Sequence, residues 1–323
     1  MTPIETGWHT LGLAIGHATD EAGATGCTVI RGIDRSFRCA AHLLGRASGT
    51  RELAVCHPDH VTEHVDAVFL TGGSAYGLDA AAGVMRWMET HGRGHPIGTG
   101  VVPIVPAATI FDLVPLGQFS ARPTAEMAYA ACDSATSANI AEGAVGAGTG
   151  ATVGKIAGPA FAMKGGVGCG HASNETLSAS AIVVTNALGD VRDAFGAIIA
   201  GARNADGTFA DGEKLLRTSP PTAGTRGNTT IALVAVNALL TKVQLAQVAA
   251  ATSAAFYRRI TPSGTSFDGD VIFAACPPTG NAAPLPAIEA LAVAAMEQAI
   301  ERSVRAARGR DGIPGLGDVH AAG

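Results

Sequence analysis

The chain has 323 residues, enough to bury a large core as one sizeable domain or two. Hydrophobic residues make up 47% of it and charged residues only 15%, a balance that excludes an intrinsically disordered protein. The net charge of −5 offers no basic surface for nucleic acid, and the apolar runs are too short to cross a bilayer. We therefore expect a globular protein with neither a nucleic-acid nor a membrane partner.

Cysteine usage and the first residues predict a cytoplasmic protein. The six cysteines are scattered and form no C-x-x-C pair, which is typical of buried thiols in a reducing compartment. Residues 1–9 include Glu5, Trp8 and His9 and show no basic segment followed by an apolar one, so we expect no export signal.

The first half of the chain predicts short strands and two helices. Strands are expected at residues 26–31, 52–56 and 65–71, and an Ala-rich helix at 124–136. After the third strand, Gly72-Gly73 leads to Ser74, which fits as the N-cap of a helix that runs to about Thr90.

The order of strand, turn and helix around Ser74 is also the context of a serine-hydrolase nucleophile elbow. That elbow requires G-x-S-x-G, but here Tyr76 stands at the second glycine position and Gly77 comes one place late. A helix cap is favoured, and a serine hydrolase that uses Ser74 stays open as an alternative.

Residues 143–155 form the richest glycine segment. A phosphate-binding loop requires G-x-x-x-x-G-K-[ST], and here Thr149 and Ile156 occupy two of the required positions. No βαβ unit with a following acidic residue frames the glycines, which argues against a dinucleotide site. The segment therefore predicts no cofactor, but a loop that brings backbone N–H groups and Lys155 close to an anionic or carbonyl group.

The second half alternates strands and helices around one polar segment. Asn186 ends a strand at 179–187, and residues 190–198 are expected to fold back on that strand as a hairpin. The composition of residues 201–227 predicts a linker that contains Pro220-Pro221. The elements expected after it are strands at 231–236 and 271–275, a helix from a capping box at Thr241, a helix from about 286 to 308, and a loose tail from 309.

Thr229 stands where the polar approach ends at Asn228 and a buried strand begins. A threonine hydroxyl is a weak nucleophile without an adjacent base, and one solution is to make Thr the first residue of a chain, so that its own α-amine is the base. Thr229 gains that amine only by cleavage after Asn228. On these residues alone, a turn that enters a strand is favoured over a cut site.

Two further clusters contain residue types that serve in catalysis or metal binding. Asp268-Gly269-Asp270 lacks the calcium-loop pattern, but two close carboxylates can share protons and deprotonate a neighbouring hydroxyl; an Asx turn explains them equally well. His57, His60 and His64 lie among acidic residues and a proline, which favours a solvated turn over a metal site. We expect no metal.

Five segments, in their order along the chain, together resemble the DmpA-like family of self-processing aminopeptidases and amidases. They are residues 71–78, 102–113, 145–155, 227–231 and 267–270. With the strands between them they cover the chain from about Leu11 to Arg302. Each segment alone is weakly specific, whereas the ordered set is specific.

The resemblance implies an α/β protein with a four-layer αββα sandwich, here as one catalytic domain over residues 1–323. It implies a precursor that cuts itself between Asn228 and Thr229 into chains 1–228 and 229–323, usually assembled as a homotetramer of processed units. The freed nucleophile then forms an acyl-enzyme with an amide substrate, and water hydrolyses it.

The resemblance also assigns roles to single residues. It makes Thr229 the nucleophile, Asp268 and Asp270 the acidic pair, Lys155 and Asn186 the polar pocket residues, and Tyr76 the active-site tyrosine. Asn186 and Lys155 can donate to a developing oxyanion, and such a donor contributes roughly 3–4 kcal/mol. The Thr nucleophile and the Asp pair resemble the nylon-oligomer hydrolase branch, because aminopeptidase members typically carry a Ser nucleophile with Ser and Glu.

We therefore expect a hydrolase of amide bonds in small peptides or aminoalkanoate oligomers. An L-aminopeptidase or D-amino-acid amidase-esterase of the same family is the first alternative. A serine hydrolase, an acyltransferase of related fold like the ornithine acetyltransferases, and a non-enzymatic binding protein are more distant ones.

Overall fold

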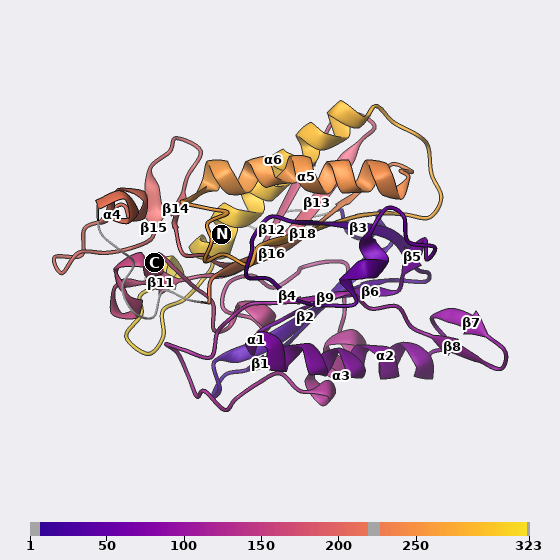
Figure 1. Cartoon of the computed structure of the whole chain (residues 1–323), viewed down its shortest axis with the longest axis horizontal. Helices are drawn as coiled ribbons and strands as arrows, with labels where there is room; N and C mark the ends of the chain where they lie inside the picture. Colours follow the sequence, from indigo (N-terminus) through magenta and orange to yellow (C-terminus); the bar gives the residue numbers. More distant parts are fainter. Residues whose placement is uncertain (1–6, 219–226, 322–323) are drawn as a thin grey trace.

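The computed structural model describes residues 7–218 and 227–321. Two β-sheets lie face to face, and helices cover the outer side of each sheet, so that the layers run α, β, β, α (Figure 1). The expected four-layer sandwich is confirmed. The space between the sheets is filled by apolar side chains from both of them, among them Ile30, Leu70, Val184, Leu233 and Phe273.

The first sheet has five strands in the order β1-β2-β6-β9-β4. Their bounds are β1 Leu13–Asp20, β2 Thr25–Gly32, β6 Ala67–Thr71, β9 Ala107–Thr109 and β4 Gly49–Arg51. Two helices cover its outer face, α2 (Ala81–Thr90) and α3 (Ala125–Asp133), the latter capped by the Thr124 side chain. Both helices were expected, because each carries an apolar stripe at helical spacing.

The second sheet has six strands in the order β12-β13-β16-β18-β3-β5. Their bounds are β12 Gly166–Ser173, β13 Ser178–Asn186, β16 Thr229–Val236, β18 Val271–Cys276, β3 Phe37–Leu43 and β5 His64–Val65. The long helices α5 (Lys242–Arg259) and α6 (Leu285–Arg305) pack on its outer face. Thr241 and Gln244 form the predicted capping box of α5.

Helix α6 approaches the second sheet closely over two glycines of β12. A Cβ atom at Gly168 would lie 2.1 Å from the Ala299 carbonyl oxygen, and one at Gly170 would lie 2.0 Å from that of Ala295. Only glycine fits at these positions, because any side chain would push the helix off the sheet.

Short elements surround the sandwich. They are α1 Ser74–Gly77, α4 Gly212–Thr218, and the strands β7 His95–Ile97, β8 Gly100–Val102, β10 Thr152–Val153, β11 Met163–Lys164, β14 Asp190–Arg192, β15 Ile198–Ala200 and β17 Ile260–Thr261. Helix α4 lies within the segment predicted to be a linker, whose residues 219–226 fall outside the described part of the chain.

Besides the Ser74 helix cap, three local predictions are wrong. Residues Leu53–Cys56 form a 3-10 helix instead of a strand, because Glu52 takes a left-handed turn before them. Strand β14 does not fold back on β13 but pairs with β15 and β17 in a separate small sheet. The tail is not loose, since the Pro314 carbonyl accepts the Lys164 N–H at 2.9 Å and Leu316–Ala321 form a 3-10 helix.

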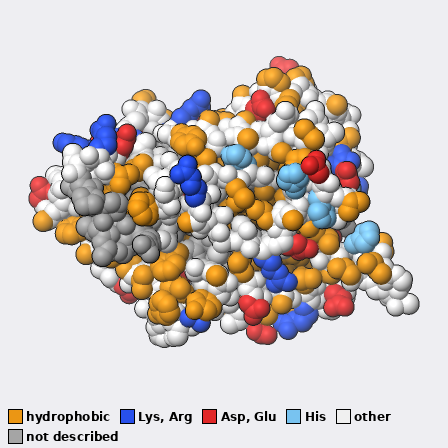
Figure 2. All heavy atoms as spheres, in the orientation of Figure 1, with side chains coloured by type: hydrophobic (Ala, Val, Ile, Leu, Met, Phe, Trp, Pro, Cys, Tyr) orange, Lys and Arg blue, Asp and Glu red, His pale blue; other side chains and the backbone are white. Residues whose placement is uncertain are grey.

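No helix within residues 7–218 and 227–321 is long and apolar enough to cross a membrane. On the face seen in Figure 2, acidic and basic side chains are interspersed among hydrophobic ones, without a broad area of one sign.

Candidate active site

One edge of the six-stranded sheet brings the predicted polar residues together. Asn186 ends β13 and Thr229 begins β16, and the two residues are direct partners in the antiparallel ladder. Asp270 immediately precedes β18, which runs parallel to β16. The end of one strand and the starts of two others therefore share this edge, and all three residues are buried.

Asn186 is the hydrogen-bonding centre of this site. Its Oδ1 accepts from the Lys155 ammonium at 2.9 Å and from the Thr152 N–H at 3.0 Å. Its Nδ2 donates to the carbonyl of Phe111 at 3.1 Å and to that of Gly227 at 3.4 Å. The side chain is fully buried, so it joins the glycine-rich segment, the segment that follows β9 and the approach to Thr229 in one rigid arrangement.

Two hydrogen bonds fix the carbonyl group of the peptide bond between Asn228 and Thr229. The Thr229 hydroxyl donates to the Asn228 carbonyl oxygen over 2.6 Å, and the same oxygen accepts the Gly269 N–H at 2.8 Å. A hydroxyl thus rests against a carbonyl that a backbone donor already polarises. The Thr229 hydroxyl and the Gly269 N–H therefore meet at the same carbonyl oxygen.

The two predicted carboxylates flank Gly269. Asp270 Oδ1 accepts the Thr230 N–H at 2.6 Å, and Asp268 Oδ2 accepts the N–H of Thr265 at 2.8 Å and its hydroxyl at 2.7 Å. Burial raises the pKa of both groups, and the neighbouring Asp268 raises the pKa of Asp270 further. Each carboxyl group therefore holds its proton more strongly than an exposed aspartic acid does.

Lys155 is buried behind Asn186 and also donates to the Asn186 backbone carbonyl at 2.9 Å. Burial lowers the pKa of Lys155 to about 7, although the nearby Asp268 and Asp270 act in the opposite direction. Its amine and ammonium forms are therefore both populated near neutral pH, as acid–base chemistry requires.

Tyr76 lies apart from these residues. Its side chain is 56% exposed and stacks under the Arg122 guanidinium, with 3.7 Å from the guanidinium carbon to the ring centroid. It lines a different, shallow cavity of about 780 Å³. Among the described residues, Tyr76 makes no hydrogen bond to the buried cluster.

Ser74 does not cap the helix that follows it. Gly73 occupies the N-cap position in a left-handed conformation, and Ser74 itself has a φ of 53°. Its N–H donates to the Ile110 carbonyl at 2.9 Å. Over the described ranges, no histidine or carboxylate is hydrogen-bonded to its hydroxyl, so the structure offers no base for a serine nucleophile there.

Two residues that the sequence did not single out complete the site. Gly269 donates its N–H to the Asn228 carbonyl, and the Phe111 carbonyl accepts from Asn186. The Phe111 ring lies against Gly227, where a Cβ would be 2.5 Å from the ring. Both act through backbone groups or close contacts. The only available signal was their position inside two of the five segments that carry the family resemblance.

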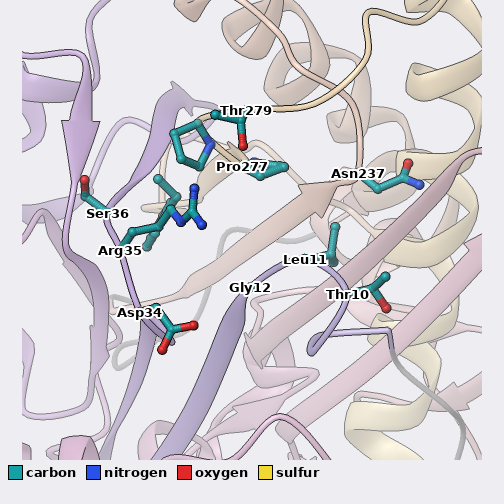
Figure 3. Close-up of a pocket in the computed structure, with 11 residues that line it drawn as sticks. Thr10, Leu11, Gly12, Asp34, Arg35, Ser36, Asn237, Pro277 and Thr279 are labelled. Carbon is teal, nitrogen blue, oxygen red and sulfur yellow. The ribbon is translucent and has the colours of Figure 1, made fainter.

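The cavity in Figure 3 lies at the opposite end of the sandwich. Its lining includes Asn237, which follows β16, and Pro277, which follows β18, together with Arg35 and Leu11. It has a volume of about 410 Å³ and contains none of the predicted site residues. The candidate active site is therefore a separate, buried feature.

The histidine segment is not arranged as a metal centre. His57 faces Asp59 at 3.7 Å on an exposed turn. In the part of the chain that the structure describes, no group of three or more His, Cys, Asp or Glu side chains could hold a metal ion.

The αββα sandwich has the fold of a solved structure that is described as a variant of the Ntn hydrolase fold. The family model of peptidase family S58 matches residues 10–315, and the chain belongs to this family. The resemblance drawn from the five segments is thereby confirmed. The chain is a hydrolase that acts on amide or peptide bonds.

Relatives with similar sequences fall into two named groups. An uncharacterized aminopeptidase of Mycobacterium tuberculosis (strain ATCC 25618 / H37Rv) is 40% identical over 243 residues, which span 71% of this chain and 67% of that protein. A 6-aminohexanoate-oligomer endohydrolase of Paenarthrobacter ureafaciens is 30% identical over 273 residues, 81% of this chain and 72% of that protein.

Solved structures support the fold. The L-aminopeptidase D-Ala-esterase/amidase of Ochrobactrum anthropi, described as a variant of the Ntn hydrolase fold, superposes with a TM-score of 0.72 at 18% identity. The match covers 97% of this chain and 90% of that one. A β-aminopeptidase of a Burkholderia species superposes with a TM-score of 0.67 at 20% identity, covering 98% and 90% of the two chains.

Proposed function

We propose that the chain cuts its own peptide bond between Asn228 and Thr229 and then uses Thr229 as the nucleophile of an amide hydrolase. The observation that carries the proposal is the 2.6 Å contact of the Thr229 hydroxyl with the Asn228 carbonyl, to which Gly269 also donates. The cut yields subunits of residues 1–228 and 229–323, which remain one catalytic domain.

The cut proceeds by transfer of the Asn228 acyl group from nitrogen to oxygen. The Thr229 oxygen adds to the carbonyl carbon and passes its proton to a buried base, for which Asp268, Asp270 and the neutral Lys155 are the candidates. The oxyanion accepts the Gly269 N–H, the C–N bond breaks, and the nitrogen takes up the proton. This step frees the Thr229 α-amine and leaves Asn228 as an ester on the Thr229 oxygen. Water then hydrolyses that ester, which releases the Asn228 carboxylate and restores the Thr229 hydroxyl.

The processed site repeats this chemistry on a substrate amide. The Thr229 α-amine takes the hydroxyl proton as the oxygen attacks the substrate carbonyl, and then delivers a proton to the leaving amine. Asn186 and Lys155 are the proposed oxyanion donors. Asn186 Nδ2 becomes available for this role when Gly227, to which it now donates, belongs to a chain end that can move. Water releases the acyl group.

Small peptides or aminoalkanoate oligomers are the proposed substrates. The 6-aminohexanoate-oligomer endohydrolases and the aminopeptidases among the relatives support this range. An L-aminopeptidase or D-amino-acid amidase-esterase activity is the alternative, supported by the Ochrobactrum anthropi neighbour. The family resemblance makes Tyr76 an active-site tyrosine, and this role stays a proposal, because its ring lines a cavity separate from the buried cluster.

We further propose that the enzyme is cytoplasmic and assembles as a tetramer of processed units, and that it needs no cofactor. The buried, unpaired thiols agree with a reducing compartment, since all six cysteines are free and buried.

Intact mass spectrometry tests the proposal. Wild type should give two fragments, the smaller beginning at Thr229, whereas Thr229→Ala should give one uncut, inactive chain. Thr230→Ala is the matched control, because the adjacent Thr230 hydroxyl has no hydrogen-bond partner among the described residues and should not be needed for the cut. A wild-type chain that stays a single 32.3 kDa species after long incubation would refute the proposal. Aminoacyl amides tested beside 6-aminohexanoate oligomers would then separate the substrate classes.

A further inference from the structure

Lys164 is a second buried lysine beside the site, and the function proposed above gives it no role. It lies on β11 with 0% of its surface exposed. Its ammonium donates to the Thr149 carbonyl at 2.8 Å and to the Ala151 carbonyl at 2.7 Å. These carbonyls flank Gly150 in the glycine-rich segment, so Lys164 fixes that segment from inside the protein.

The Lys164 backbone holds the same segment a second time. Lys164 is the direct partner of Thr152 in the antiparallel pair of β11 and β10. The N–H of Thr152 donates to Asn186 Oδ1, which also accepts from Lys155, three residues further along. The position of Lys164 therefore determines how two of the donors to Asn186 are placed.

The charge of Lys164 is not neutralised by a direct ion pair. Asp112, Glu21 and Asp311 are nearby acidic groups and Arg310 and Lys155 are nearby basic ones, but no described carboxylate forms a salt bridge with Lys164. Asp112 instead accepts from the Thr25 hydroxyl at 2.7 Å and from the Gly73 N–H at 2.6 Å. A buried ammonium held only by carbonyls is expensive, and a neutral donor could hold the same carbonyls at lower cost.

We propose, on the basis of the proposed function, that Lys164 is a positioning residue for the reaction of Thr229. It holds the glycine-rich segment so that Thr152 and Lys155 orient Asn186.

The electrostatic part of this proposal has a defined direction. Burial is the main cause of the low pKa of Lys155, and Lys164 lowers that pKa further, while Asp268, Asp270 and Asp112 raise it. Removing the Lys164 charge therefore moves the titration of Lys155 to higher pH. This shift has the same sign whichever protonation state of Lys155 the reaction uses.

The test compares Lys164→Met and Lys164→Gln with Lys242→Met. Lys242 is a matched control, because it is also buried and donates to two carbonyls, those of Val55 at 2.7 Å and Thr62 at 2.9 Å, away from the site. The rate of self-cleavage is measured against pH for each folded, full-length chain. Both Lys164 variants should move the midpoint of the pH profile upward, and Lys164→Met should slow the cut by about 100-fold.

Each outcome decides between the proposals. A wild-type rate and midpoint in both Lys164 variants would overturn the role of Lys164 and leave the proposed function intact. The same holds if both variants fail to fold while Lys242→Met folds, because Lys164 would then serve the fold alone. If wild type itself is not cut, the proposed function fails instead. A slower cut with an unchanged midpoint would overturn the electrostatic part.

Discussion

Replacing Gly269 by alanine tests the geometry around the bond after Asn228. A Cβ at Gly269 would lie 2.8 Å from the Thr229 hydroxyl oxygen and 2.6 Å from the Ala47 carbonyl oxygen, whereas ordinary contacts begin at 3.4 Å. The hydroxyl must therefore move by about 0.6 Å, the difference of 3.4 and 2.8 Å, or the segment that carries the Gly269 N–H must retreat. Either movement separates the groups that the cut needs.

The expected loss follows from these displacements. Misplacing a reacting group by ~1 Å can cost about 100-fold in rate. Losing one oxyanion donor costs ~100- to 1,000-fold, or about 2.7–4 kcal/mol. We therefore expect Gly269→Ala to be cut about 100-fold more slowly than wild type, with a loss of folding stability of about 1–3 kcal/mol from overpacking.

The assay follows conversion of the freshly folded precursor by intact mass over time. Gly309→Ala is a matched control, because a Cβ there would lie 2.6 Å from Asp318 Oδ2 and 2.9 Å from the Ile313 carbonyl, in the C-terminal segment. Wild-type kinetics in a folded Gly269→Ala chain would refute the reasoning, since the close approach of Gly269 to Thr229 would then have no part in the cut.

Two further predictions concern the buried polar groups. Asn186→Asp keeps the acceptor for Lys155 but replaces the donor to Phe111 and Gly227 with an oxygen. Self-cleavage measured by intact mass should therefore slow. The pH midpoint of the cut should move upward, because the new carboxylate raises the pKa of Lys155. The second prediction concerns the stability of the uncut Thr229→Ala chain. Folding lowers the pKa values of Lys155 and Lys164 from 10.5 to about 7, so between about pH 7 and pH 10.5 the native state binds fewer protons than the unfolded chain. Its free energy of unfolding by urea should therefore rise with pH in this window, by up to about 1.4 kcal/mol per pH unit for each lysine, and adding Lys164→Met should remove that lysine's share; an unchanged slope would contradict the assigned burial.

The elements that set the site could be predicted because each carries a strong local pattern. The apolar run after Thr229 and the run that ends at Asn186 each predict a strand from their own residues. The capping box at Thr241 predicts the start of a helix. Their meeting at one sheet edge was not readable from these patterns, because it depends on which strands pair. The family resemblance supplied that information.

The errors arose where tertiary contacts override local signals. Ser74 has the residue type of a helix cap, but Gly73 takes the N-cap position and Ser74 lies in the left-handed region as the first residue of the helix. The pattern of residues 190–198 predicts a hairpin with the preceding strand, but β14 pairs with β15 and β17 instead. The roles of Gly269 and Phe111 rest on a backbone N–H and a carbonyl, which every residue type carries.

The strand order has a consequence for the fate of the two chains after the proposed cut. Strands β16 and β18 belong to the smaller chain, but they lie in the middle of the six-stranded sheet, with β13 on one side and β3 on the other from the larger chain. The smaller chain can leave only if two strand ladders break at once. The cut therefore breaks the covalent chain but leaves the two products bound to each other. A purification tag on either chain should recover both chains.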